Sequence, residues 1–189
     1  MAYKKTELGR LAAEVRAELG LGDNARFDPH AWAALWGVPF KALGDIASAP
    51  EAVDYFTRVA PGSWSAALLR NGPGHVVVYN SSHSPERVLS NLAHEIAHLV
   101  AEHELDGSWM QDENGCGAAR PNDEKEAAEL AGALLVPAAV ARQHAIYGRS
   151  EQALALKYGV SVPMALWRMR ESGGTVIRQR YLAKQRRGR

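Results

Sequence analysis

The sequence has little cysteine, no long apolar run and almost no acidic residues near its end. Cys116 is the one cysteine among 189 residues, which excludes an intramolecular disulfide and indicates a reducing compartment. No apolar stretch reaches the roughly 20 residues of a membrane-spanning helix, and the first residues lead into an amphipathic pattern instead of an apolar signal core. Because 47% of the residues are hydrophobic, we expect a cytoplasmic protein with a proper core.

The charge is unevenly distributed along the chain. Residues 1–141 hold 11 Lys and Arg against 19 Asp and Glu, a balance of −8, whereas residues 142–189 hold 11 basic residues and two acidic ones, a balance of +9. This asymmetry predicts either a basic face that meets an acidic partner such as nucleic acid, or a solvated terminus without a specific role.

A helix–turn–helix spacing over residues 150–172, with Gly159 at the turn, makes a DNA-binding regulator the alternative function. However, Val162, Pro163, Met164 and Ala165 occupy the positions that would read bases, and such side chains pack instead of reading sequence. The basic side chains would then contact phosphates nonspecifically; they are Arg168, Arg170, Arg178, Arg180, Lys184, Arg186, Arg187 and Arg189.

The periodicity predicts a mostly helical α+β fold with a small antiparallel sheet beside one central helix. A single domain is expected over 1–172, followed by a basic tail over 173–189. A long loop over 103–122 contains Cys116, for which no role can be assigned. The expected helices cover 5–19, 29–36, 84–102, 123–136, 137–147 and two segments of 150–171; the expected strands cover 38–42, 64–70 and 75–79, with an extended segment at 53–59.

The chemistry is concentrated in His94-Glu95-Ile96-Ala97-His98, within the expected helix 84–102. Ser84-Pro85-Glu86 is a typical helix start, with a serine cap, a proline and an acid in the first turn. Two histidines four residues apart project from one helix face, so their imidazoles can hold one zinc ion. Glu95 is then placed to act as general base on the water at the metal.

A catalytic zinc needs a third protein ligand, and the sequence offers several carboxylates. The metzincin pattern is excluded because Ala101 and Glu104 stand where it needs Gly and His, and His103 is one residue away from the required position. On the expected helix 123–136, Glu124 and Glu126 both border the apolar stripe, whereas Glu129 points further away. Helical periodicity therefore does not decide whether Glu124 or Glu126 is the third ligand.

The order of strand, His-Glu-x-x-His helix and Glu126-Ala-Ala-Glu-Leu-Ala-Gly-Ala-Leu-Leu-Val-Pro137 resembles the ImmA/IrrE family of bacterial and phage metallopeptidases. The resemblance covers most of residues 5–172, although Ala128 and Leu130 depart from the family's usual Asn or Asp and Phe. It implies that Glu126 is the third ligand, together with His94 and His98. It also implies a zinc-dependent endopeptidase that cleaves a cytoplasmic protein, commonly a helix–turn–helix repressor that controls mobile elements.

Zincins bind substrate as an extended strand beside a sheet edge, and we expect the strand 75–79 to be that edge. Its residues His75, Val77 and Tyr79 would then contact substrate. The sequence does not rank the residues that would stabilise the oxyanion, which include His144, Tyr147, Tyr79 and His83. A binding module that keeps the zinc but cleaves nothing is a third reading, and the intact Glu95 argues against it.

Overall fold

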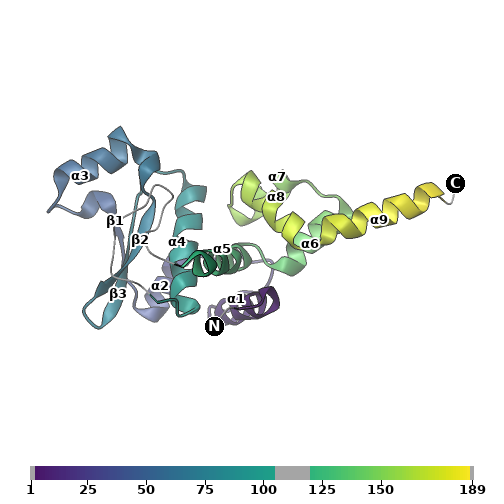
Figure 1. Ribbon diagram of the computed structural model, residues 1–189, viewed down its shortest axis with the longest axis horizontal. Helices are drawn as coiled ribbons and strands as arrows, with labels where there is room; N and C mark the ends of the chain where they lie inside the picture. Colours follow the sequence, from purple (N-terminus) through teal and green to yellow (C-terminus); the bar gives the residue numbers. More distant parts are fainter. Residues whose placement is uncertain (1–2, 105–119, 188–189) are drawn as a thin grey trace. The chain divides into compact units, whose positions relative to one another are not determined.

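A computed structural model describes residues 3–104 and 120–187 (Figure 1). These residues form a mostly helical α+β structure with one three-stranded sheet, which confirms the predicted fold class. The chain groups into two compact units, while the single domain expected over 1–172 stays a prediction. The first unit comprises residues 1–4 and 28–131, and the second comprises residues 5–27 and 132–189. None of the helices within the described residues has the length and apolar character needed to cross a membrane.

The sheet of the first unit has the strand order β1-β3-β2. Strands β2 (Ala66–Asn71) and β3 (Gly74–Tyr79) form the predicted hairpin, with Asn71 opposite Gly74. Gly72 has φ of 59° in the two-residue loop between them, a conformation that glycine adopts without strain. Strand β1 (Phe40–Ala42) pairs in parallel with the other side of β3, so the sheet is mixed and not purely antiparallel.

Helices cover this sheet and complete the core of the first unit. Helix α2 (Pro29–Trp36) begins after the capping side chain of Asp28 and ends at Gly37, as predicted. Helix α4 (Pro85–Val100) packs against β2, β3 and α2. The core residues that these elements bury include Trp32, Ala66, Val77, Leu92, Ala93, Ile96 and Ala97. The core thus holds one side of α4 rigidly against the sheet.

The segment 53–59 is helical, so the prediction of an extended segment is wrong. Pro50 occupies the first turn of α3 (Pro50–Asp54), where the missing proline N–H costs nothing, and the chain continues as the π-helix η2 (Tyr55–Val59). Arg58 forms an ion pair with Asp54 one turn earlier. Short 3-10 turns, η1 (Leu43–Asp45) and η3 (Pro61–Ser63), flank this region.

A buried asparagine anchors the loop between β3 and α4. The amide of Asn80 donates to the carbonyls of Phe56 and Trp64 at 2.7 and 3.2 Å, and its carbonyl oxygen accepts from the backbone and hydroxyl of Ser82. Asn80 has 0% exposure, so these hydrogen bonds satisfy polar groups that water does not reach. They fix the path by which the chain enters α4.

The second unit is a helical assembly. It contains α1 (Lys5–Glu18), α6 (Ala138–Tyr147), α7 (Glu151–Tyr158), α8 (Val162–Glu171) and α9 (Gly174–Arg187). Helix α5 (Pro121–Leu135) begins in the first unit and ends in the second. Where the sequence predicted a basic tail, the structure has α9, which packs against α6.

Candidate metal centre

Helix α4 places the three residues of the central motif. Its first turn is capped as predicted, since the hydroxyl of Ser84 accepts from the backbone N–H of Arg87 at 3.4 Å. Leu92, Ala93, Ile96 and Ala97 are each no more than 1% exposed and lock the helix against the core. His94 and His98 lie one turn apart on the adjoining face, with ring centroids 4.8 Å apart.

The structure brings Glu124 of α5 to these two histidines. The Nε2 atoms of His94 and His98 lie 3.1 Å apart. Glu124 Oε2 lies 3.1 Å from His94 Nε2, and Glu124 Oε1 lies 3.4 Å from His98 Nε2. One ligand atom from each residue therefore falls within 4.8 Å of the others.

This arrangement fits a divalent metal ion. Tetrahedral zinc with bonds of 2.0–2.1 Å holds its ligand atoms about 3.3 Å apart, close to the spacing of the three residues here. Glu124 Oε1 is buried and has no hydrogen-bond partner in the described part of the chain. A cation would be satisfied by all three groups at once, whereas two facing imidazole nitrogens can share only one hydrogen.

The electrostatics of the cluster also favour a cation. The imidazoles of His94 and then His98, which face the Glu124 carboxylate, hold its pKa well below its ordinary value. Burial alone would lower the pKa of His94, but the hydrogen bond to Glu124 and the charges of Glu95 and Glu124 outweigh it and raise that pKa. Two carboxylates therefore place negative charge around the imidazoles.

The three side chains of the cluster differ in their exposure to solvent. The side chain of His98 is 4% exposed, whereas those of His94 and Glu124 are 23% and 33% exposed. Glu95 is 4% exposed and lies close enough for its charge to act on His94. A catalytic zinc site requires three ligands, access for water and substrate, and an adjacent carboxylate, and partly exposed His94 and Glu124 beside buried Glu95 are compatible with these requirements.

Glu126, which the family resemblance implied as a ligand, lies one step outside this cluster. Its Oε1 accepts from the backbone N–H of Tyr3 at 3.0 Å, and its Oε2 lies 3.5 Å from Nε2 of His103. His103 in turn lies against the far side of the His98 ring, because α4 ends at Val100 and Glu102 adopts a left-handed φ of 53° that turns the chain back. The sequence did not predict these contacts of His103, because they depend on the local turn at Glu102.

The predicted substrate strand does not have the expected position. Strand β3 lies in the centre of the sheet with partners on both sides, so it is not an edge. The side chain of Val77 is 0% exposed and belongs to the core, and the ring of Tyr79 packs edge-on against His30. His75 pairs with Arg70 in the hairpin.

Three of the oxyanion candidates are held by other contacts or lie in the second unit. The ring of His83 is engaged at both nitrogens, with Nε2 2.6 Å from the Pro61 carbonyl and Nδ1 3.5 Å from the Asn91 amide. His144 and Tyr147 belong to the second unit, whose position relative to the cluster is not determined. Cys116 and most of the predicted loop 103–122 lie outside the described residues.

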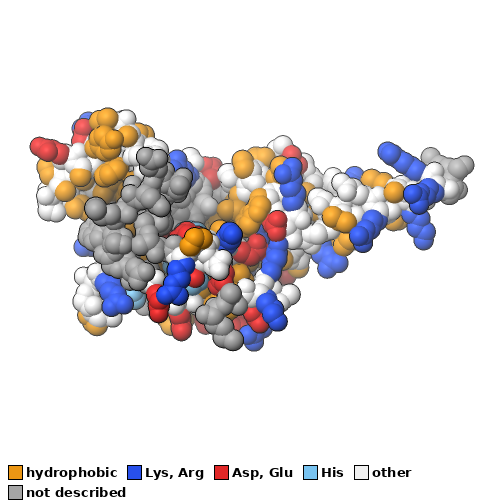
Figure 2. All heavy atoms as spheres, in the orientation of Figure 1, with side chains coloured by type: hydrophobic (Ala, Val, Ile, Leu, Met, Phe, Trp, Pro, Cys, Tyr) orange, Lys and Arg blue, Asp and Glu red, His pale blue; other side chains and the backbone are white. Residues whose placement is uncertain are grey.

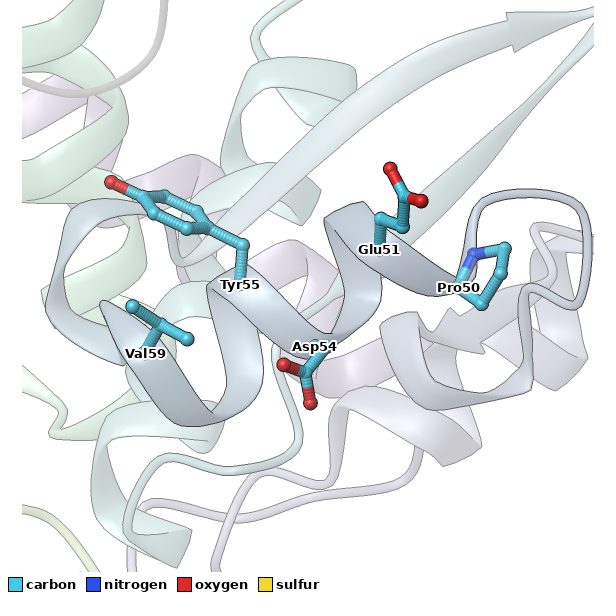
Figure 3. Close-up of a pocket in the computed structure, with 5 residues that line it drawn as sticks. All are labelled: Pro50, Glu51, Asp54, Tyr55 and Val59. Carbon is cyan, nitrogen blue, oxygen red and sulfur yellow. The ribbon is translucent and has the colours of Figure 1, made fainter.

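A surface hollow in the first unit lies on α3 and η2 (Figure 3). It is lined by Pro50, Glu51, Asp54, Tyr55 and Val59, and shares no residue with the cluster. Its carboxylate at Asp54 is already paired with Arg58, and no histidine or cysteine lines it. With two carboxylates as its metal-binding side chains, the hollow offers fewer ligands than the three of the cluster.

A comparison with protein families agrees with the geometry. No curated protein matches the sequence significantly. A family model described as the IrrE N-terminal-like domain, one of the peptidase families, matches residues 51–170. That range includes α4 with its two histidines and α5 with Glu124. The chain therefore belongs to the IrrE N-terminal-like family of peptidases.

Proposed function

We propose that this protein is a zinc-dependent endopeptidase whose metal is held by His94, His98 and Glu124. The observation that supports it is the approach of one atom from each of these residues to within 4.8 Å of the others. Two neutral imidazoles and one carboxylate form a donor set typical of catalytic zinc. Glu124 thereby replaces Glu126 as the proposed third ligand.

Bound zinc would polarise the scissile carbonyl and lower the pKa of the attacking water. Glu95 would accept the proton of that water at its carboxylate and later deliver it to the leaving amine. Its burial at 4% exposure keeps this carboxylate in a fixed position beside His94. The exposed side of His94 and Glu124 would admit the substrate.

Strand β2 is the edge to which we assign an extended substrate. Among the described residues it pairs only with β3, and α4 packs against it. It is six residues long, whereas the opposite edge strand β1 has three. An extended peptide added to β2 would gain main-chain hydrogen bonds beside the helix that carries the site.

The family resemblance supports a cytoplasmic protein substrate, and a helix–turn–helix regulator is the class we propose. A repressor of that class would lose its activity on cleavage. The single cysteine agrees with a reducing compartment.

Metal analysis tests the proposed centre directly. Purified protein loaded with zinc and then dialysed is expected to retain about one zinc per chain by elemental analysis, because three ligands converge. His94→Ala should lose most of this zinc, whereas His75→Ala, which removes a histidine from the hairpin, should retain it. A wild-type protein without bound zinc, or equal retention by His94→Ala, would contradict the proposal.

A second candidate function, nonspecific nucleic-acid binding, is favoured by α9. This helix carries five basic side chains and no acidic one. Several of its Lys and Arg side chains stand out along it in Figure 2. Arg180, Lys184, Arg186 and Arg187 are exposed along it. Two other arginines that were predicted to contact phosphates have partners within the protein. Arg168 is 2% exposed and donates to the Val136 carbonyl. The guanidinium of Arg178 lies over Gly148.

The salt dependence of DNA binding tests this second function. Four phosphate contacts predict that the logarithm of affinity falls with the logarithm of salt with a slope of about −3.6. Replacing Arg180 and Lys184 by glutamine should reduce the steepness by about 2, as measured by gel shift on duplex DNA. Replacing Arg10 and Arg70 by glutamine is the matched control and should leave the slope unchanged. If the protein binds no DNA at low salt, or if the two double variants give equal slopes, nucleic-acid binding through α9 is excluded.

A further inference from the structure

The ring of His98 is held on both sides. Its Nε2 faces the cluster with His94 and Glu124, and its Nδ1 lies 3.0 Å from Nδ1 of His103. The two rings meet edge to face, with centroids 5.0 Å apart and an interplanar angle of 72°. Their side chains are only 4% and 6% exposed, so this contact is shielded from water.

The second nitrogen of His103 continues the chain of contacts. His103 Nε2 lies 3.5 Å from Oε2 of Glu126. The Glu126 side chain is 10% exposed, and its other oxygen accepts from the backbone N–H of Tyr3. A buried carboxylate thus stands behind two imidazoles in series.

The Glu126 carboxylate, at the end of this series, determines which nitrogen donates and which accepts at each histidine. A carboxylate accepts, so His103 donates from Nε2 and presents a lone pair at Nδ1. His98 then donates to that lone pair from its own Nδ1, which leaves Nε2 without a hydrogen and directed at the cluster. This is the tautomer that binds a metal through Nε2.

We propose that His103 and Glu126 are positioning residues that fix the tautomer and ring orientation of His98 through a Glu126–His103–His98 relay. The inference rests on the proposed metal centre and adds a function for two residues that do not bind the metal. It also gives Glu126 a place in the site, one shell outside the ligands. Outer partners of this kind typically change metal affinity by 10- to 100-fold when removed.

Zinc affinity, measured by competition with a chromophoric chelator, tests the relay in a double-mutant cycle. His103→Phe keeps a ring of similar size and removes both nitrogens, so affinity should fall by about 10- to 100-fold. Glu126→Gln should cause a smaller loss. Because the two residues act in series, the double variant should match His103→Phe alone, and the losses should not multiply.

A conservative variant and a spectrum separate positioning from a structural role. His103→Asn places an amide oxygen near the position of Nδ1 and should recover part of the lost affinity. The visible absorption of the Co²⁺-loaded protein should change in His103→Phe and remain as in wild type in the control His75→Phe. The thermal unfolding midpoints of the metal-free variants establish that each one folds.

The outcomes distinguish this inference from the proposed function. Wild-type protein that binds no zinc would contradict the metal centre itself. Wild-type protein that binds zinc, with His103→Phe within about twofold of it, would overturn the relay alone. Multiplying losses in the double variant would also overturn it, since they would show that the residues act independently.

Discussion

Glu95→Gln is expected to lower peptide hydrolysis by about 10²- to 10⁴-fold while the zinc content stays as in wild type. The amide has nearly the same shape as the carboxylate, so the buried position at 4% exposure remains filled. It cannot accept the proton of the attacking water, and it donates no proton to the leaving amine. Cleavage of a peptide library, with the new termini identified by mass spectrometry, measures the effect.

Glu86→Gln is the matched control for this change. Glu86 lies in the first turn of the same helix and is partly exposed, so the same substitution there should leave both hydrolysis and zinc unchanged. If Glu95→Gln cleaves as fast as wild type, Glu95 is not the general base. If wild type holds zinc but cleaves nothing in the library or in a repressor substrate, the protein is a zinc-containing binding module.

The parts of the site that lie on one helix were predictable from sequence. The serine cap at Ser84 sets where α4 begins, and the spacing of four sets His94 and His98 on one face. Both depend only on local geometry. The hairpin of β2 and β3 was predictable for the same reason, because its turn residues are contiguous.

The sheet order was not predictable because it depends on a distant pairing. Strand β1 has three residues and joins β3 from more than 30 positions away, which turns the expected edge strand into the central one. The predicted substrate contacts at His75, Val77 and Tyr79 assumed that edge. Short parallel pairings carry no local turn signal.

The third ligand could not be predicted from the sequence, because it depends on which face of α5 is turned toward α4. Ala127, Leu130 and Leu134 of α5 are each 0% exposed and form its buried stripe. Glu124 and Glu126 border this stripe, and the apolar pattern is satisfied whichever of them faces the histidines. In the structure Glu124 meets His94 and His98, whereas Glu126 meets His103 and Tyr3.

The same substitution at these two glutamates, which lie two residues apart on one helix, is therefore expected to lower zinc affinity by very different amounts. Glu124→Gln is expected to lower zinc affinity by more than about 100-fold and to abolish hydrolysis, because a neutral amide is a poor ligand for zinc. Glu126→Gln should lose about 10-fold or less, since its amide oxygen can still accept from His103. Glu129→Gln, one turn further along α5, removes the same charge and should leave affinity unchanged. Chelator competition on all three variants measures the ranking. If Glu126→Gln loses more zinc affinity than Glu124→Gln, Glu126 is the third ligand. That result would refute both the proposed ligand set and the relay built on it.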